Sequence, residues 1–214
     1  MVHLAGFKAF LKRKDIEFSL RRYGIDALGA MAQGLFCSLL IGTILNTLGS
    51  QTGVTIFSTV GGYATAMSGP AMAVAIGYAL KCPPLVLFSL VPVGWASNAL
   101  GGAGGPLAVL VIAIVAAEVG KMVSKETPVD VLVTPLVTIF AGVALAALIA
   151  PPIGAGANYV GALIKRATVL QPFWMGIIVS ASVGIALTLP ISSAAICHSF
   201  NLVGLAGGAA VAGC

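Results

Sequence analysis

Long apolar runs, separated by short turns that are rich in polar residues or glycine, dominate the sequence. A helix needs about 20 consecutive apolar residues to cross the hydrocarbon core of a bilayer. The runs that reach or approach this length are residues 26–49, 54–80, 84–102, 106–123, 130–150, 173–189 and 191–214. The pattern therefore predicts an all-α integral membrane protein, a polytopic helical bundle with about six or seven spans.

Glycine and proline interrupt several of these runs. The interruptions are TAMSGP at 65–70, GGAGGP at 101–106, PPIGAG at 151–156 and LPISS at 189–193. Irregular backbone at membrane depth is tolerated only where it is buried in protein or lines a cavity. Broken or re-entrant helices of this kind are a sequence indication of the substrate site of a transporter.

The second run is too long to form one straight helix. Pro70 lacks a backbone donor and clashes with the preceding turn, so Ser68-Gly69-Pro70 predicts a division after about 14 residues of the run. Three interpretations stay open here, namely a kink, a re-entrant break, and close helix packing through small residues.

Two segments have the mixture of apolar and basic residues that is typical of helices on a membrane surface. Residues 1–22 combine phenylalanines and leucines with lysines and arginines, which predicts a cytoplasmic amphipathic N-terminal helix. Residues 158–171 are too short and too polar to span, and prolines flank them, which predicts a separate interfacial helix. Residues 23–214 then form the transmembrane domain.

The composition agrees with a membrane protein. Hydrophobic residues make up 59% of the chain, charged residues 8%, and the mean hydropathy is +1.08. Soluble domains carry roughly a quarter charged residues, so a soluble fold is excluded. The net charge of +5 does not indicate a nucleic-acid partner, because six of the eleven lysines and arginines precede the first span. The positive-inside rule predicts a cytoplasmic N-terminus, while Lys165 and Arg166 leave the topology after Pro151 open.

No motif for a metal or a cofactor is present in the sequence. The four cysteines have no C-x-x-C spacing, and neither a Walker sequence nor a nucleophile elbow occurs. We therefore expect no metal and no cofactor. The last run ends in GLAGGAAVAGC without a polar tail or a helix stop. We expect the domain to be incomplete at Cys214, or to be completed by a partner chain.

Polar residues in the last apolar run are the main candidates for a binding site. Pro190, Ser192 and Ser193 are typical of the start of a half-helix, whose free backbone N–H groups attract acceptor or anionic groups. His198 and Asn201 follow within the same uncharged stretch. His198 could hydrogen-bond a hydroxylated solute, carry a proton, or simply pack against a backbone carbonyl, and these interpretations stay open.

Ionisable and amide side chains within the other runs are further candidates, because polar groups inside a membrane are often functional. Glu118 precedes Lys121 by three residues, which favours an ion pair that snorkels to the interface, with a proton site as the alternative. Asn98 and Asn46 are weaker polar candidates. Asp130 follows a Thr-Pro pair, so a helix-start role is favoured over proton transfer.

Several short motifs resemble a known family of transporters. TPLVT at 134–138 and APPIG at 150–154 are followed by an amphipathic segment and then by PISSAA at 190–195. This order resembles the membrane subunit, enzyme IIC, of phosphotransferase-system sugar transporters, distantly of the fructose or glucose type. Residues 10–49 look like the stand-alone IIC-like group. Ser192-Ser193 replaces an Asn-Lys pair of the fructose type, and the acidic re-entrant motif of many members is absent from these residues.

The resemblance implies a function and partners. A homodimer would translocate a small hydroxylated solute, such as a sugar, by alternating access, and a phosphorylated IIB protein would donate the phosphoryl group. The chain itself would position the reactants and form no covalent intermediate, as part of a protein-phosphohistidine–sugar phosphotransferase. The alternative is an ion-coupled secondary transporter that keeps this fold, with His198 or Glu118 as the proton site. A membrane scaffold is disfavoured, because it does not need broken helices.

Overall fold

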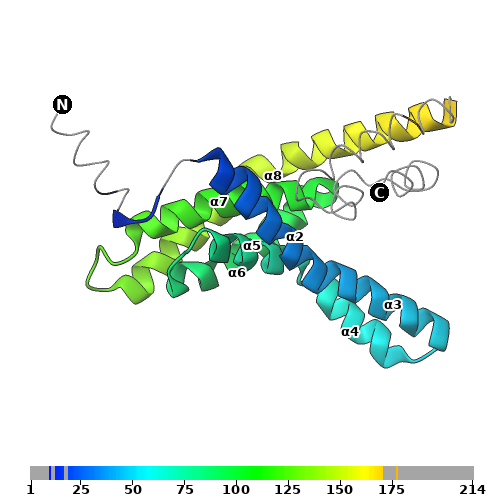
Figure 1. Cartoon of the computed structure of the whole chain (residues 1–214), viewed down its shortest axis with the longest axis horizontal. Helices are drawn as coiled ribbons and strands as arrows, with labels where there is room; N and C mark the ends of the chain where they lie inside the picture. The colour runs from blue at the N-terminus through cyan, green and yellow to red at the C-terminus, as the bar shows by residue number, and fades with distance from the viewer. Residues whose placement is uncertain (1–9, 11–12, 17–18, 171–176, 178–214) are drawn as a thin grey trace.

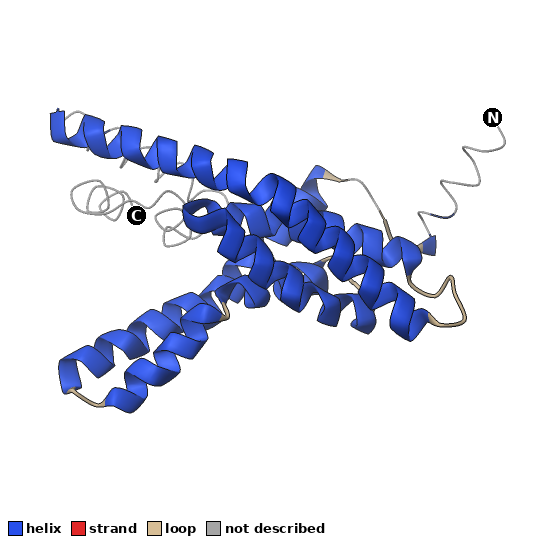
Figure 2. Cartoon of the chain, turned by 180° about the vertical axis from the view of Figure 1, so that it is seen from behind, coloured by secondary structure: helices blue, strands red, loops and turns tan. Residues whose placement is uncertain are grey.

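The protein is built from helices throughout the described residues. The structure is a computed structural model, and it describes residues 10, 13–16, 19–170 and 177. Within these ranges no strand occurs, and the helices form a bundle from which a helical hairpin projects as an arm (Figures 1 and 2). The prediction of an all-α protein is therefore confirmed.

The first membrane span is a single, very long helix. It runs without interruption over Arg22–Thr52, 31 residues, which corresponds to about 46 Å at 1.5 Å per residue. Gly53 ends it in a left-handed conformation (φ 71°), and the Gly53 N–H donates to the Gly49 carbonyl. The successive parts of this helix are η1 (Arg22–Asp26), α2 (Ala27–Leu35), η2 (Phe36–Leu40) and α3 (Ile41–Thr52).

The second apolar run is divided, as the sequence predicts. It forms α4 (Thr55–Ala66) and α5 (Ser68–Ala79), 12 residues each, with the break at Met67 rather than at the Ser68-Gly69-Pro70 triplet. Pro70 lies in the first turn of α5, where a missing N–H leaves no helical bond unmade. The Met67 N–H still donates to Tyr63, and the Ala71 N–H to Met67. The break is therefore a kink at which Met67 makes both of its backbone hydrogen bonds.

The remaining helices are α6 (Pro84–Gly101), α7 (Gly105–Val123) and α8 (Asp130–Leu170), with a short turn η3 (Gly102–Gly104) between α6 and α7. The predicted interruption at 151–156 is wrong, because α8 is continuous for 41 residues and includes Pro151 and Pro152. The separate interfacial helix predicted at 158–171 is wrong for the same reason, since α8 carries the chain through Leu170. Prolines are tolerated inside membrane helices, where local adjustment and neighbouring groups satisfy the freed carbonyls.

Four helical stretches in the described part of the chain are long and apolar enough to cross a membrane. They are Arg22–Thr52, Pro84–Gly101, Gly105–Val123 and Asp130–Tyr159. The predicted span at 54–80 is not among them as one helix, because the kink divides it. The predicted spans at 173–189 and 191–214 lie outside the described residues apart from Ile177, so the total of six or seven stays a prediction.

Glycines set the separation of the helices in the bundle. A Cβ atom at Gly94 of α6 would lie 2.5 Å from the Gly69 carbonyl oxygen of α5. A Cβ atom at Gly154 of α8 would lie 2.4 Å from the carbonyl oxygen of Gly101, next to the glycine-rich turn. Small residues let membrane helices approach until their backbones touch. The GGAGGP sequence is thus where α8 crosses the α6–α7 connection.

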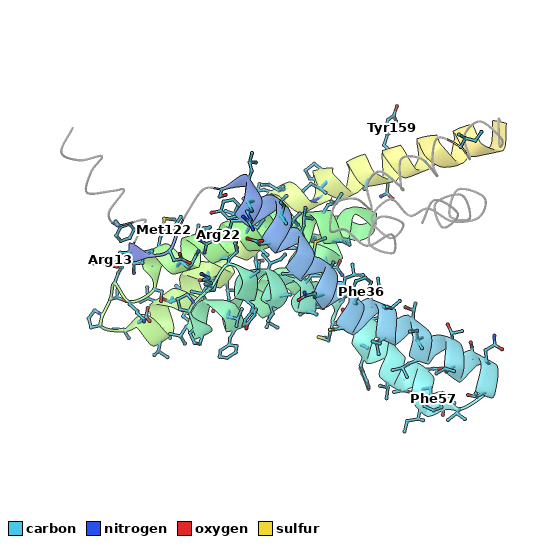
Figure 3. All side chains as sticks on the ribbon, viewed as in Figure 1. Arg13, Arg22, Phe36, Phe57, Met122 and Tyr159 are labelled. Atoms are coloured by element: carbon cyan, nitrogen blue, oxygen red, sulfur yellow. The ribbon has the colours of Figure 1, made fainter. Side chains whose placement is uncertain are left out.

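The arm consists of α3 and α4, which pack against each other and diverge from α6, α7 and α8 (Figure 1). Phe57 lies near its tip (Figure 3). Gly42, Gly49 and Gly61 bring the two helices together, since a Cβ atom at each would overlap the opposite helix. The outer surface is apolar, with Ile56 64% exposed. Such a surface is compatible with lipid, which solvates apolar side chains.

We expect Gly94→Ala to destabilise the protein by roughly 1–3 kcal/mol, because the added methyl group overlaps the α5 backbone. Gly62→Ala is the matched control, since a Cβ atom there meets nothing within 4 Å. The measurement is the thermal unfolding midpoint in detergent, followed by size-exclusion chromatography. Equal midpoints for the two variants would contradict this account of the α5–α6 crossing.

Candidate functional site

Charged side chains gather at one end of the bundle, where α2 begins, α5 ends and α7 turns into α8. Arg13, Arg22 and Met122 all lie at this end, opposite the tip of the arm (Figure 3). We call this group of side chains the charged end. Its members are Arg13, Lys14, Asp15, Arg22, Lys81, Glu118, Lys121, Lys125, Glu126 and Asp130.

Lys121 is the centre of the charged end. It is 1% exposed, and its Nζ lies 2.9 Å from Oε2 of Glu118 on the same helix. The same ammonium donates to the carbonyl oxygens of Asp15 (3.1 Å) and Leu80 (3.3 Å). The ion pair expected from the i,i+3 spacing is present. The expectation that it snorkels to the interface is wrong, because the N-terminal segment, described here over residues 13–16, and the end of α5 cover it.

The neighbours of Lys121 are also paired. Oε1 of Glu118, which is 7% exposed, accepts a hydrogen bond from the Tyr23 hydroxyl at 3.0 Å. Arg22 donates to the Leu80 carbonyl at 2.8 Å and to Oδ2 of Asp15 at 2.7 Å. Leu80 directly follows α5. The carbonyl groups at the C-terminal end of a helix have no intrahelical donor and attract cations, and the Leu80 carbonyl is one of them.

The N-terminal segment is held against the turn between α7 and α8. Lys14 donates to the Ser124 carbonyl, and its Nζ lies 2.6 Å from Glu126 Oε1. Arg13 contacts the same carboxylate at 2.6 Å. The hydrogen bond from Lys14 lowers the pKa of Glu126, and the hydrogen bond from Arg22 lowers the pKa of Asp15.

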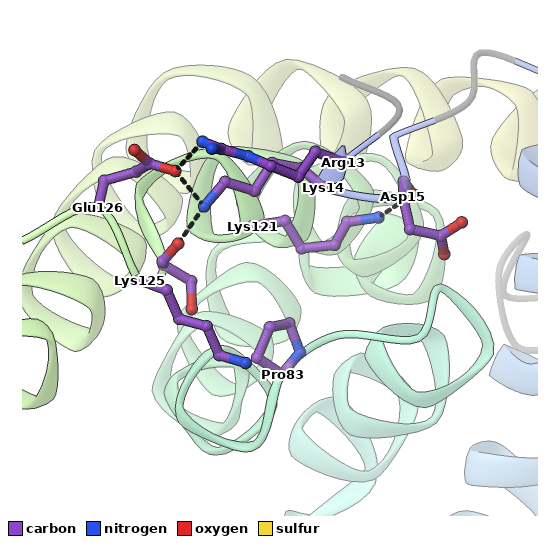
Figure 4. A pocket seen from close by; sticks show the side chains of 8 residues that line it. Arg13, Lys14, Asp15, Pro83, Lys121, Lys125 and Glu126 are labelled. Carbon is purple, nitrogen blue, oxygen red and sulfur yellow. Dashed lines mark hydrogen bonds and ion pairs between the residues drawn. The ribbon is translucent and has the colours of Figure 1, made fainter. Parts of the chain in front are cut away.

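A cavity of about 380 Å³ opens at the charged end (Figure 4). The Ser124 hydroxyl is buried beside it and has no hydrogen-bond partner among the described residues. The Lys125 side chain extends towards Pro83 on the opposite wall (Figure 4). The lining residues are Arg13, Lys14, Asp15, Pro83, Lys121, Ser124, Lys125 and Glu126.

The other polar candidates are dispersed over the molecule. Asn98 donates to the Ser68 hydroxyl at 3.4 Å, beside the kink between α4 and α5. Asn46 lies in the arm, where its Oδ1 would be 2.4 Å from a Cβ atom added at Gly61. Neither lies near Glu118 at the charged end. The candidates Pro190, Ser192, Ser193, His198 and Asn201 lie outside the described residues.

A second, more open cavity of about 750 Å³ lies between α2 and α5. Its lining is mostly glycine, alanine and aliphatic side chains, with Asp26, Gln33 and Tyr78 as the polar members. In the part of the chain that the structure describes, no group of three or more histidine, cysteine, aspartate or glutamate side chains could hold a metal ion.

The sequence does not predict most of the contacts within the charged end. Asp15, Tyr23 and Leu80 are 106, 95 and 41 residues from their partners in α7. The only signal in the sequence was the spacing between Glu118 and Lys121. Because the other contacts depend on how α2 and α5 pack against α7, no local pattern could indicate them.

Comparison with known proteins assigns the family. A family model described as "Phosphotransferase system, EIIC" matches residues 25–214. The chain belongs to this family. The EIIC protein is thus a membrane-spanning transport component of the phosphotransferase system, as the resemblance of the sequence motifs indicated. The fructose or glucose type stays a prediction. No match is found among curated proteins or among solved structures.

We expect Lys121→Met to destabilise the EIIC protein by about 3–5 kcal/mol, because it leaves the buried Glu118 carboxylate without its ion pair. Lys81→Met is the matched control, since Lys81 is exposed. Adding Glu118→Gln to Lys121→Met should restore part of the loss by removing the uncompensated charge. Thermal unfolding in detergent measures all three, and equal midpoints for Lys121→Met and Lys81→Met would contradict the central role of Lys121.

We expect the attachment of the N-terminal segment to weaken in acid. The folded-state pKa of Glu126 is lowered, so its ion pairs stabilise the protein at neutral pH and are lost as the pH falls from 4.5, the ordinary value, through the folded value. The measurement is the difference in unfolding midpoint between the wild type and Glu126→Gln. This difference in midpoint should be present at pH 7 and should shrink as the pH falls below 4.5. A difference that grew in acid would have the wrong sign.

Proposed function

We propose that this EIIC protein is the permease of a phosphoenolpyruvate-dependent phosphotransferase system, and that it translocates a small hydroxylated solute, a sugar, by alternating access. The observation that carries the proposal is the family match over residues 25–214. The kink at Met67 and the long continuous helices support it, because alternating access needs rigid elements that meet at irregular backbone.

The proposed solute contacts are Pro190, Ser192, Ser193, His198 and Asn201. The start of a half-helix offers free N–H groups and serine hydroxyls, which suit the hydroxyls of a sugar and the charge of a phosphoryl group. A solute hydroxyl would attack the phosphoryl group on a phosphorylated IIB protein. The phosphoryl bond to IIB would break, and the hydroxyl proton would pass to the IIB side chain that is freed. The EIIC chain would align the two reactants without becoming phosphorylated.

The proposed orientation has the charged end in the cytoplasm. Arg13, Lys14, Lys81, Lys121 and Lys125 all belong to this end, which agrees with the positive-inside rule. A IIB protein would then approach from the same side. We further propose a homodimer in the bacterial inner membrane, with six or seven spans per chain and re-entrant segments among them.

The alternative is an ion-coupled secondary transporter with Glu118 or His198 as its proton site. The structure argues against Glu118 in this role. Glu118 is paired with Lys121 in a buried position. Protonation of this carboxylate would leave the Lys121 ammonium buried without its counter-charge, which is costly. Glu118 therefore suits a structural role better than proton transport, and His198 would have to serve alone.

The test is uptake of a panel of labelled sugars into vesicles that contain the complete protein, with and without phosphoenolpyruvate and the soluble phosphotransferase components. We expect a phosphorylated sugar inside, formed only when phosphoenolpyruvate is present. Ser192→Ala and His198→Ala should lower the rate about tenfold through lost hydrogen bonds. Ser50→Ala, in the exposed part of the arm, should leave it unchanged.

Accumulation of unmodified solute with a proton or sodium gradient would reject the phosphotransferase role. Full activity of both Ser192→Ala and His198→Ala would keep the role but reject the proposed solute site.

A further inference from the structure

We propose that the cavity at the charged end binds an oxyanion of the phosphate class, held by the Ser124 hydroxyl and the Lys125 ammonium. This inference goes beyond the transport of a solute and does not depend on it. The cavity lies between the N-terminal segment, the end of α5 and the turn from α7 to α8, so an occupant would contact all three (Figure 4).

The Ser124 hydroxyl is the first observation. The residue is 3% exposed, and its Oγ is buried without a hydrogen-bond partner among the described residues. Buried polar atoms in native proteins almost always have a partner, and those that lack one call for an explanation such as a bound water or ion. Because Ser124 lines the cavity, an occupant of the cavity is the available acceptor for this hydroxyl.

The charge of the surroundings is the second observation. Among the described residues, the lining of the cavity contains four cationic side chains and two carboxylates, a surplus of two positive charges. A water molecule could satisfy Ser124, but it would not balance this surplus. An anion would do both.

The carboxylates of the charged end are already engaged. Asp15 binds Arg22, Glu118 binds Lys121, and Glu126 binds both Arg13 and Lys14.

Asp130 accepts hydrogen bonds from the Lys125 backbone N–H and the Thr134 hydroxyl. The Lys125 ammonium forms no ion pair with any described carboxylate. It is therefore free to bind an external anion on the wall of the cavity.

The size of the cavity permits a phosphate group with its hydration. A water molecule occupies roughly 30 Å³ of liquid, so about 380 Å³ holds a phosphate group together with several waters. Two sources supply this chemistry at a membrane surface, namely soluble phosphate and the phosphodiester of an anionic lipid headgroup.

The experiment measures binding of radiolabelled inorganic phosphate to the purified protein in nanodiscs of phosphatidylcholine, by equilibrium dialysis at fixed ionic strength. We expect saturable binding by the wild type, and binding about tenfold weaker in Ser124→Ala and in Lys125→Gln, because each loses a donor to the anion. Arg21→Gln is the matched control. It removes one exposed positive charge outside the cavity lining and should bind phosphate as the wild type does.

Nanodiscs that contain phosphatidylglycerol distinguish the sources. Loss of phosphate binding in these nanodiscs would support the site with a lipid headgroup as its occupant, and unchanged binding would support it with soluble phosphate. The absence of saturable binding in phosphatidylcholine would overturn the proposal. So would an equal loss in Arg21→Gln and Lys125→Gln, since that would show general charge attraction. No transport is measured, so these outcomes are separate from those of the uptake test.

Discussion

The buried ammonium of Lys121 is the interaction on which the charged end depends. One side chain on α7 contacts Glu118, the carbonyl of Asp15 and the carbonyl of Leu80. A lysine without partners would be costly in this position, so α5 and the N-terminal segment must both be in place for the burial to be tolerated. The folding of this end is therefore coupled to the packing of α2 and α5 against α7.

Backbone contact through glycine sets the geometry of the remaining bundle. Gly69 meets Gly94 between α5 and α6, and Gly154 meets Gly101 between α8 and the turn after α6. Within a membrane the lipid is as apolar as the side chains, so packing and backbone proximity stabilise helix association more than apolar burial does. The glycine-rich interruptions in the sequence mark these crossings. The continuous helix Arg22–Thr52 carries α3 out of the bundle, and α4 packs against α3 to form the arm (Figure 1).

Membership of the EIIC family gives these features a context. Backbone hydrogen bonds must stay satisfied at membrane depth, and at the junction of α4 and α5 both backbone hydrogen bonds of Met67 are made. The charged end offers a fixed electrostatic surface at one end of the bundle. Two features of this end are not explained by packing alone. They are its open cavity and the Ser124 hydroxyl, which has no hydrogen-bond partner within the part of the chain that the structure describes.

The sequence alone determined the helical class, the order of the long apolar spans, the division of the run at 54–80 and the pairing of Glu118 with Lys121. Each follows from residues close together in the chain, through hydropathy, proline chemistry or helical spacing. Tertiary structure decided that α8 continues through Pro151 and Pro152, and that Lys121 is buried instead of snorkelling. Both outcomes rest on contacts with distant segments, such as Gly154 with Gly101 and Lys121 with Asp15 and Leu80. Local sequence patterns do not predict such contacts, because the same residues would form the same helices if those helices packed in another arrangement.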